Sequence, residues 1–309
     1  MRQKFKSMLL TISFILSANT AMAQGPGKRA KVIDTTPQHV LIAGDSNQSI
    51  TVGGMQRSYI LHIPAGYHGS ARLPLVFVLH GMGGTGESIA QKTGMSAKAD
   101  QENFIVVYPN GVGHPIVWNV GLSDISNNGA DDVGFIRAVM DKLEHDLRID
   151  RNRIYCCGFS SGAIMSYLLG AQLSHRLAAI GIASGTVGNT ASGPVRMIPD
   201  PSEPVPVIAF HGQQDHTIYY NGGGKFANLP VADSIAFWVK ADGCASPPQK
   251  TTRQQGNLTI DDYDSCRDGS EVVLYTFVNG THEWPTLQNN DQLSATDSIW
   301  KFFVKHARK

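Results

Sequence analysis

Short, nearly continuous apolar runs recur along this chain from residue 73 onwards. Many of their residues are β-branched, and polar or glycine-containing segments separate them. Strands that helices cover on both faces have this pattern, whereas strands with one exposed face alternate apolar and polar residues. The runs that predict such strands are Leu73 to His80, Phe104 to Tyr108, Arg153 to Gly158, Ala178 to Ala183, Val205 to His211 and Glu271 to Val278.

Helical periodicity fills several of the segments between these runs. Either Asp131 or Asp132 can cap a helix, because apolar residues recur after them at steps of three and four residues. These apolar residues are Phe135, Ile136, Val139, Met140 and Leu143. Further helices are predicted over Ala163 to Leu173, Val231 to Lys240 and Ile299 to Val304.

An antiparallel hairpin is predicted ahead of this alternation. Ser49 to Val52 and Gln56 to Pro64 flank Gly53-Gly54, and two glycines between strand-like runs are a hairpin signal. A leading hairpin followed by alternating strands and helices predicts an α/β fold with a mostly parallel central sheet and helices on both faces. We expect one such domain over residues 49–309, after a leader over residues 24–48 that has no sustained period.

The first 23 residues have the organisation of a secretory signal peptide. Three basic residues precede the apolar run Met8 to Leu16, and a small-x-small cleavage signal ends at Ala23. An uncleaved membrane anchor would need about 20 apolar residues, roughly twice what this run supplies. We therefore expect secretion with cleavage before Gln24, either to a periplasm or out of the cell.

Without that segment the chain is slightly acidic. The whole chain has 26 Lys and Arg against 25 Asp and Glu, and the segment holds three of the basic residues and none of the acidic ones, which leaves 23 minus 25, or −2. The basic residues are scattered rather than clustered, so no surface suited to nucleic acid or to anionic lipid is predicted. No later stretch is long and apolar enough to cross a bilayer, and we expect no stable membrane anchor.

The four cysteines are predicted to be of two kinds. Cys244 and Cys266 lie in polar, turn-rich sequence, and in an oxidising compartment a disulfide between them would close a long loop. Cys156 and Cys157 are adjacent in a predicted strand, where neighbouring side chains point to opposite faces, so they should not bond to each other. We expect them to be small, buried core residues.

The segment Gly158-Phe159-Ser160-Ser161-Gly162 joins a predicted strand to a predicted helix. In this context a Gly-x-Ser-x-Gly pattern places its serine in a strained turn at the carboxyl edge of the sheet. The two glycines are needed where a Cβ would collide with neighbouring backbone, and the following helix directs N–H groups towards charge that forms beside the serine. The sequence predicts Ser160 as a nucleophile; the alternative is a tight turn built from small residues.

A serine hydroxyl needs a base and an orienting acid to act as a nucleophile at neutral pH. Asp215 follows the predicted strand that ends at His211, and His282 follows the one that ends at Val278. The order Ser, Asp, His, with each residue in a loop after a strand, lets all three converge on one sheet edge, and we predict them as a catalytic triad. The alternatives are His211, His216 and His306 for the base and Asp233 for the acid.

An oxyanion hole needs two N–H donors directed at the tetrahedral intermediate. One is predicted to be the amide of Ser161, and the other the amide of Met82 in the glycine-rich loop after His80, with Gly83 as the alternative. A plain flexible loop is the other interpretation of these glycines. The chain has no His-x-x-x-His pattern and no carboxylate cluster at metal-ligand spacing, so we expect neither a metal nor another cofactor.

Two tryptophans are candidates for a wall against an acyl group or a sugar: Trp284, two residues after His282, and Trp118. Ordinary core or surface positions are the alternative for both. The glycine- and proline-rich segments Gly188 to Pro206 and Tyr219 to Pro230 are expected to border the cleft. Neither has the pattern of a helical lid, so we expect an open cleft, which suits acyl groups attached to a polymer.

Six motifs occur in order along the chain: "LHGMGG", "VVYPNG", "ADDVGFI", "GFSSG", "AFHGQQD" and "THEWP". From about Gln56 to the end, the chain resembles the LpqC-type poly(3-hydroxybutyrate) depolymerase and feruloyl/acetylxylan esterase family, an α/β-hydrolase group. The resemblance implies ester hydrolysis through an acyl-enzyme. It also implies that Ser160, Asp215 and His282 correspond to the family's triad and the "HGMGG" loop to its oxyanion loop. Many relatives carry cysteine where Met82 stands, a difference that leaves the amide in place.

The resulting hypothesis is a secreted serine esterase that acts on feruloyl or acetyl groups of polysaccharides, with hydroxyalkanoate oligomers as the second candidate substrate. Family members that attack solid polyester usually carry an added polymer-binding domain, and none is expected here. A serine peptidase and a non-catalytic binding relative are the remaining alternatives. Peptidases of this fold commonly add a propeller or cap, and a binding relative would be expected to lose a triad residue.

Overall fold

The computed structural model describes residues 43–121, 129–190, 193–245, 247–253, 256–288 and 293–309. All of them belong to one compact unit, Leu41–Lys309. The predicted signal peptide and most of the expected leader lie in residues 1–42, outside the described residues. Within the described ranges, no helix is both long enough and apolar enough to cross a membrane.

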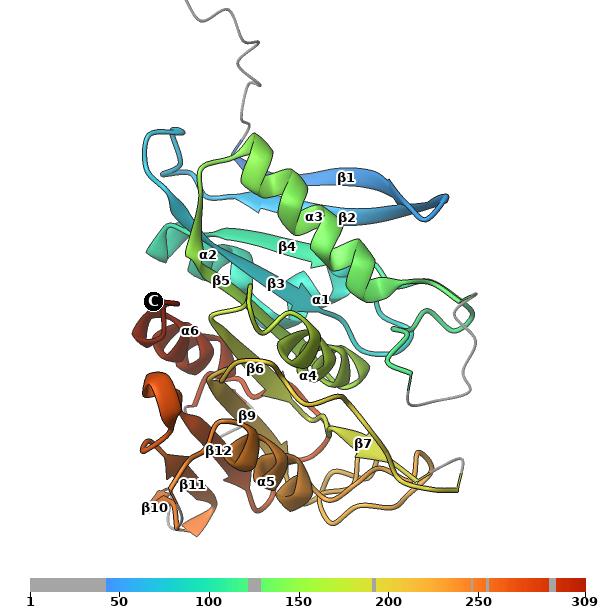
Figure 1. Cartoon of the computed structure of the whole chain (residues 1–309), viewed down its shortest axis with the longest axis vertical. Helices are drawn as coiled ribbons and strands as arrows, with labels where there is room; N and C mark the ends of the chain where they lie inside the picture. The colour runs from blue at the N-terminus through green and yellow to red at the C-terminus, as the bar shows by residue number, and fades with distance from the viewer. Residues whose placement is uncertain (1–42, 122–128, 191–192, 246, 254–255, 289–292) are drawn as a thin grey trace, which may run out of the picture. The chain divides into compact units, whose positions relative to one another are not determined.

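A sheet of ten strands runs through this unit in the order β1-β2-β4-β3-β5-β6-β9-β12-β11-β10 (Figure 1). The neighbours from β4 to β12 in this order pair in parallel, whereas β1 and β2 at one end and β11 and β10 at the other pair antiparallel. The predicted mostly parallel sheet with a leading antiparallel hairpin is therefore confirmed. The strands are β1 (Gly44–Val52), β2 (Met55–Ile63), β3 (Leu73–Leu79), β4 (Ile105–Pro109), β5 (Ile149–Phe159), β6 (Ala179–Ala183), β9 (Val207–Gly212), β10 (Gln249–Arg253), β11 (Leu258–Tyr263) and β12 (Val272–Phe277), and a separate small hairpin pairs β7 (Gly188–Asn189) with β8 (Arg196–Met197).

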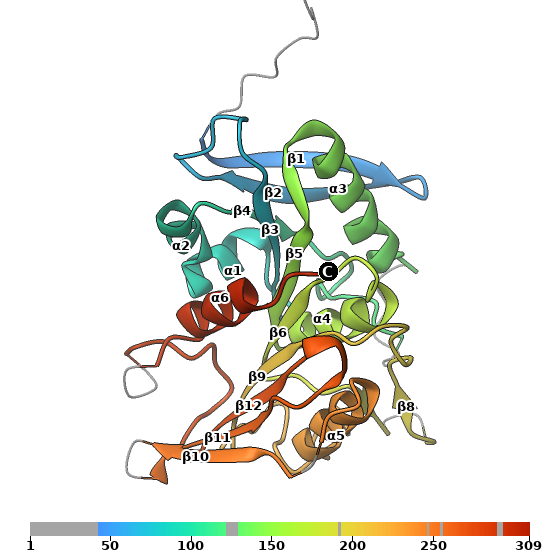
Figure 2. The ribbon, with the colours of Figure 1, turned by 60° about the vertical axis from the view of Figure 1, so that its left-hand side comes forward.

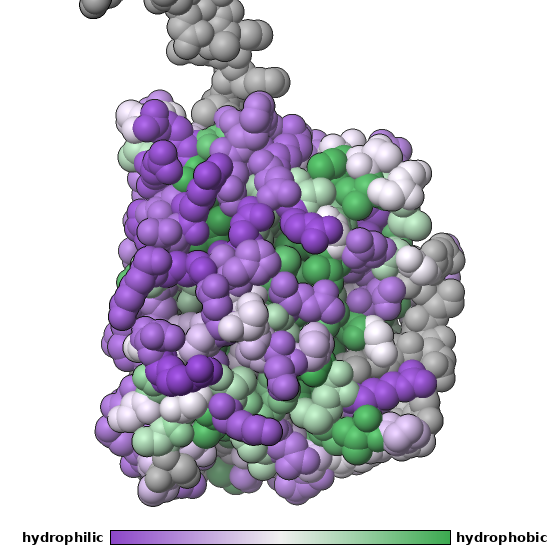
Figure 3. Space-filling view, viewed as in Figure 1, coloured by the Kyte–Doolittle hydropathy of each residue, from purple (hydrophilic) through white to green (hydrophobic). Residues whose placement is uncertain are grey.

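Helices cover both faces of the sheet, as predicted. Their bounds are α1 (Gly86–Thr93), α2 (Met95–Glu102), α3 (Asp132–Asp146), α4 (Ser161–Gln172), α5 (Val231–Ala241) and α6 (Ala295–Lys305), with a short 3-10 turn at Arg267–Gly269. In β3, Leu75 and Phe77 face a core shared with α3, α4 and α5, whereas Val76 and Val78 face a second core shared with α1, α2 and α6. Figure 2 shows these two sets of helices on opposite sides of the strands. The face shown in Figure 3 carries mostly hydrophilic side chains, with hydrophobic ones in separate patches.

Asp131 and Asp132 have different roles at the start of α3. Asp131 is the helix cap, and its Oδ1 accepts a hydrogen bond from the Gly134 amide at 2.7 Å. Asp132 is instead fully buried and forms an ion pair with Arg57 of β2 at 2.5 Å. Arg57 also donates to the Asn110 carbonyl at 3.0 Å. This buried charge pair ties the leading hairpin to α3.

The predicted pattern lacks six of the observed strands and helices: β7, β8, β10, β11, α1 and α2. All five residues of β10 are exposed at the edge of the sheet, so no apolar run marks this strand. The helices α1 and α2 have eight residues each, too few for a sustained period. In addition, β1 begins at Gly44, five residues before the expected Ser49, because polar residues there pair with β2 while remaining half-exposed.

A disulfide joins Cys244 to Cys266, which confirms the predicted pairing. It links the segment after α5 to the segment before β12. Cys156 and Cys157 are free and fully buried, and they point into the two opposite cores, as predicted.

A buried carboxyl group lies two residues before this disulfide. Asp242 is 0% exposed; its Oδ1 accepts a hydrogen bond from the Val205 amide at 3.1 Å and its Oδ2 from the Ser270 hydroxyl at 2.5 Å. Burial raises the pKa of Asp242 to about 7, although these two hydrogen bonds and the charge of Arg267 oppose the shift. Asp242 thereby connects the end of α5 to the segments that lead into β9 and β12.

We predict that Asp242 makes the folded state less stable as the pH rises from about 4 to about 7. Its pKa is higher in the folded chain than in the unfolded chain, so the folded state binds more protons in this window. The free energy of unfolding should therefore fall by up to about 1.4 kcal/mol per pH unit. Asp242→Asn should remove this contribution to the slope of the unfolding free energy against pH. The asparagine amide can donate to Ser270 while its oxygen accepts from Val205, so both contacts can be kept.

Thermal unfolding followed by circular dichroism at several pH values measures the effect. Asp200→Asn, at an exposed position, is the control and should keep the slope of the unaltered protein. An unchanged slope in Asp242→Asn would contradict the prediction.

Candidate active site

Ser160 lies at the junction of β5 and α4. Its backbone has φ 56° and ψ −121°, a conformation that costs of order 1–3 kcal/mol for a residue with a Cβ. The Ser160 amide donates to the Ala183 carbonyl of β6 at 2.9 Å, and its carbonyl accepts from the Ile164 amide of α4 at 3.1 Å. Hydrogen bonds to a strand and to a helix therefore hold this strained residue in place.

The glycines on either side of Ser160 leave no room for a side chain, as predicted. A Cβ on Gly158 would lie 2.3 Å from the Gly162 oxygen, and a Cβ on Gly162 would lie 2.3 Å from the Leu79 oxygen and 2.5 Å from the His80 oxygen. The start of α4 therefore packs directly against the end of β3. This packing brings Ser160 next to the loop that follows β3.

The structure brings Ser160, His282 and Asp215 together in one hydrogen-bonded chain. The Ser160 hydroxyl lies 2.9 Å from His282 Nε2, and His282 Nδ1 lies 2.8 Å from Asp215 Oδ2. Asp215 follows β9 and His282 follows β12, and these two strands are neighbours in the sheet. Because β5, β9 and β12 run parallel, the loops after them meet at one edge.

Three of the alternative residues have other contacts or positions. His306 Nε2 is 2.9 Å from Glu271 Oε2. The His216 ring packs edge-on against Tyr219, and Asp233 lies in the first turn of α5. In the part of the chain that the structure describes, no group of three or more His, Cys, Asp or Glu side chains could hold a metal ion.

Asp215 is 2% exposed and accepts hydrogen bonds on both oxygens. Its Oδ1 accepts from the amides of Thr217 and Ile218, each at 2.8 Å. His211, an alternative base in the sequence, is buried beside it; its Nε2 donates to the Ile218 carbonyl at 2.8 Å and lies 3.4 Å from Asp215 Oδ2. Burial alone would raise the pKa of Asp215, but hydrogen bonds from His211, His282 and the Thr217 amide and the charge of His282 hold it well below its ordinary value. The carboxylate therefore stays ionised and directed at His282.

The loop after β3 brings Met82 to the same cavity as Ser160 and Ser161. Gly83 is the alternative donor for an oxyanion hole. Its amide already donates to the Ile116 carbonyl at 2.7 Å and is therefore not directed at a substrate. The amides of Met82 and Ser161 are therefore the better pair of candidates.

His80, which the sequence analysis did not single out, holds the start of this loop from within the core. It is 0% exposed; its Nε2 accepts from the Gly111 amide at 2.9 Å, and its Nδ1 donates to the Gly81 carbonyl at 2.7 Å. Burial lowers the pKa of His80 more than the bond to Gly81 raises it, which agrees with the neutral ring that this pattern needs. The His80 carbonyl accepts from the Trp118 indole at 2.8 Å. A histidine at the end of a buried strand, directly before a glycine-rich loop, is the signal that could have identified it.

A cavity of about 360 Å³ opens beside Ser160, with mainly apolar walls. Trp118 is among its lining residues, although only 1% of its surface is exposed, so its contact with substrate stays a prediction. Phe159, Ile164 and Phe226 also line it and were not predicted to do so. Of these, Phe226 lies in one of the two segments expected to border the cleft, and Gly188 and Asn189 of the other segment line the cavity too.

Trp284 lies in the core rather than in the wall of this cavity, so the expectation that it contacts substrate is wrong. It is 1% exposed and packs in the core shared with α1, α2 and α6. Its indole donates to the Thr296 hydroxyl at 3.1 Å. The chain after His282 thus directs the tryptophan inward, towards α6.

The sequence is similar to those of known esterases. Residues 57–209 match the family model described as Esterase PHB depolymerase. A probable feruloyl esterase C of Aspergillus terreus is 29% identical over 302 residues, which cover 96% of this chain and 96% of that protein. A probable feruloyl esterase C of Aspergillus clavatus is 30% identical over 259 residues, which cover 80% of this chain and 83% of that protein.

Solved structures share the fold. An acetyl xylan esterase from Aspergillus awamori has a TM-score of 0.61 at 16% identity, and the match covers 84% of this chain and 99% of that chain. A CE1 ferulic acid esterase from Anaeromyces mucronatus, in complex with ferulic acid, has a TM-score of 0.52 at 15% identity, covering 88% of this chain and 93% of that chain. These likenesses concern the fold, and they confirm the expected α/β-hydrolase architecture.

We predict that glycine is more stabilising than alanine at position 160. Ser160→Gly and Ser160→Ala both remove the hydroxyl, but only alanine keeps a Cβ at positive φ, which costs about 1–3 kcal/mol. The greater freedom of glycine in the unfolded chain costs about 0.5–1 kcal/mol. Ser160→Gly should therefore have the higher free energy of unfolding, by about 1 kcal/mol, in urea titrations.

Position 161 provides the control for this comparison. Ser161 is the first residue of α4, where alanine is favoured over glycine, so the order of the two variants should reverse. A higher stability of the alanine variant at both positions would show that the turn at Ser160 is not strained.

Proposed function

We propose that this chain, which belongs to the family of the feruloyl esterases described above, is a secreted serine esterase that hydrolyses feruloyl esters of plant polysaccharides. Membership of the family makes it a carboxylic ester hydrolase. The finer proposal rests on one observation, the hydrogen-bonded chain from Ser160 through His282 to Asp215 beside an apolar cavity of about 360 Å³.

In the proposed mechanism, Ser160 Oγ attacks the ester carbonyl carbon while His282 Nε2 takes the hydroxyl proton. Asp215 accepts the hydrogen bond from Nδ1, keeps the imidazole in the required tautomer and stabilises the imidazolium. The oxyanion accepts hydrogen bonds from the amides of Met82 and Ser161. The imidazolium returns the proton to the alcohol oxygen as the ester C–O bond breaks. In the second half of the reaction, a water molecule gives a proton to the same imidazole and attacks the acyl carbon. The imidazolium then protonates Ser160 Oγ as the acyl–Oγ bond breaks and the acid leaves.

The size and chemistry of the cavity favour an aromatic acyl group over acetyl. Its lining residues include Trp118, Phe159 and Phe226, of which Phe226 is the most exposed. An aromatic side chain buries about 150–250 Å², which at about 25 cal/mol per Å² corresponds to roughly 4–6 kcal/mol. An acetyl group offers a single methyl group and would leave most of the 360 Å³ unfilled.

Secretion is proposed from the signal-peptide pattern of residues 1–23. The disulfide between Cys244 and Cys266 supports this proposal. Disulfides persist in oxidising compartments and are rare in the cytosol.

Hydroxyalkanoate oligomers are the second candidate substrate, because the matching family model is that of PHB depolymerase esterases. A hydroxybutyryl unit is aliphatic and smaller than a feruloyl group, so it would contact the three rings less extensively. Rates on methyl ferulate and on 3-hydroxybutyrate oligomers compare the two candidates directly. A peptide anilide in the same panel tests for peptidase activity.

Ser160→Ala should lower the turnover number on methyl ferulate by about 10⁴- to 10⁶-fold, because it removes the attacking oxygen. Initial rates of the purified protein measure this loss, and thermal unfolding shows whether the variant is folded. Ser70→Ala, at an exposed position, is the control and should retain full activity. Full activity in Ser160→Ala would refute the assignment. So would a native protein that hydrolyses no ester and that a serine-directed phosphonate does not label.

The proposed acyl group should contact Phe226. Phe226→Ala should lower kcat/KM for methyl ferulate about tenfold, because it removes one aromatic contact and part of the apolar wall. The rate of this variant on p-nitrophenyl acetate should stay within about twofold of the native rate, because the methyl group of acetate contacts the wall little. This second substrate therefore shows whether the triad is intact. Equal losses on the two substrates would contradict an aromatic acyl site.

A further inference from the structure

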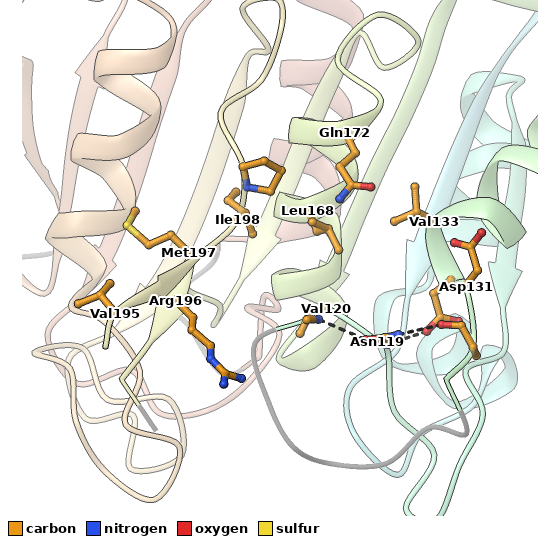
Figure 4. Close-up of a pocket in the computed structure, with 14 residues that line it drawn as sticks. Asn119, Val120, Asp131, Val133, Leu168, Gln172, Val195, Arg196, Met197 and Ile198 are labelled. Atoms are coloured by element: carbon orange, nitrogen blue, oxygen red, sulfur yellow. Dashed lines mark hydrogen bonds between the residues drawn. The ribbon is translucent and has the colours of Figure 1, made fainter. Parts of the chain in front are cut away.

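A second hollow, of about 570 Å³, adjoins the cavity at the nucleophile, and Val120 lines both. Figure 4 shows Leu168 and Gln172 of α4 between two walls. One wall carries residues 195–198, and the other carries Val120 and Asp131.

Helix α4 connects the two hollows. Ile164 lines the cavity beside Ser160, whereas Leu168 and Gln172, four and eight residues further on, line the second hollow. Residues at steps of four lie on the same face of a helix. One face of α4 therefore contributes to both hollows.

The small hairpin of β7 and β8 connects them as well. Gly188 and Asn189 of β7 line the cavity beside the nucleophile. Their cross-strand partners, Met197 and Arg196 of β8, line the second hollow. With Val120, three separate segments of the chain thus contribute to both hollows, and the two form consecutive compartments of one trough.

Buried charge holds the wall that contains Val120. The Asn119 amide donates to Asp132 Oδ2 at 2.6 Å, and the Asn119 side chain donates to the Ala130 carbonyl at 3.0 Å. Asp132 is in turn paired with Arg57, and both side chains are almost fully buried. This wall is therefore formed before any ligand binds.

The second compartment offers both polar and apolar groups to a ligand. Asp131, Gln172 and Arg196 line it from exposed positions and supply hydrogen-bond donors and acceptors. Val195 and Met197 line it too, with 59% and 42% of their surface exposed. A sugar presents hydroxyl groups and apolar C–H faces, and so matches both kinds of group.

On the basis of the proposed function, we propose that this compartment binds the oligosaccharide that forms the alcohol part of the substrate. The aromatic acyl group occupies the apolar compartment beside Ser160, and the sugar chain extends along α4 past Gln172 and Arg196. The compartment then raises the enzyme's preference for feruloyl groups attached to oligosaccharides over the same groups attached to simple alcohols.

Two esters with the same acyl group test this proposal: methyl ferulate and a feruloylated arabinoxylo-trisaccharide. In Gln172→Ala/Arg196→Ala, kcat/KM for the trisaccharide ester should fall about tenfold or more, mainly through KM, because two side chains that hydrogen-bond the sugar are lost. The value for methyl ferulate should stay within about twofold. The matched control is Gln249→Ala/Arg253→Ala, which removes the same residue types from exposed positions in β10 and should change neither value.

Equal kcat/KM changes on both esters, or no change on either, would overturn the proposal. A series of methyl esters with acyl groups of increasing length gives a further test. If the loss of kcat/KM in Gln172→Ala/Arg196→Ala grows with acyl length, the proposal is overturned, because the compartment then holds the acyl chain.

If the native protein hydrolyses neither of the two ferulate esters, the proposed function fails, and a binding measurement decides whether the compartment binds the sugar. Titration of Ser160→Ala with the unesterified arabinoxylo-trisaccharide should shift NMR signals of α4, and adding the Gln172 and Arg196 substitutions should abolish the shifts. An absence of shifts would overturn the binding site itself.

Discussion

The packing of Gly162 against the end of β3 is the constraint on which the geometry of the active site depends. It brings α4 so close to the carbonyls of Leu79 and His80 that a Cβ at position 162 has no place. The same His80 carbonyl accepts the hydrogen bond from the Trp118 indole. One short stretch of backbone therefore sets the position of the helix behind Ser160, of the loop after β3 and of the cavity wall.

The acid and base are positioned by hydrogen bonds rather than by close packing of backbone. Two main-chain amides hold Asp215 Oδ1, which leaves Oδ2 to face His282. His211 completes the surroundings of the carboxylate from the buried side, through its bond to the Ile218 carbonyl. An ionised and oriented carboxylate can then hold the imidazole of His282 towards Ser160.

Much of this arrangement could be predicted because its determinants are local in the sequence. The glycines around Ser160 predict a crowded turn. The apolar runs predict the parallel strands, and so predict which loops lie at the same edge of the sheet. Trp284 shows where such reasoning ends: its neighbour His282 faces the cavity, but the direction of the tryptophan depends on how the chain turns towards α6. Phe226 reaches the cavity through a loop whose path no local pattern encodes. The strand β10 needs only main-chain pairing at the sheet edge, so its polar sequence carries no strand signal.

The two free cysteines stand directly before the turn that carries Ser160, and their burial has a chemical consequence. Burial raises the pKa of the Cys156 thiol to about 12, and it raises the pKa of Cys157 well above its ordinary value. Exchange with glutathione and alkylation both require a thiolate. These thiols are therefore inert in the folded protein and do not compete with the serine for electrophiles. A cysteine-directed label would report the opening of the sheet core, and it would leave an intact active site untouched.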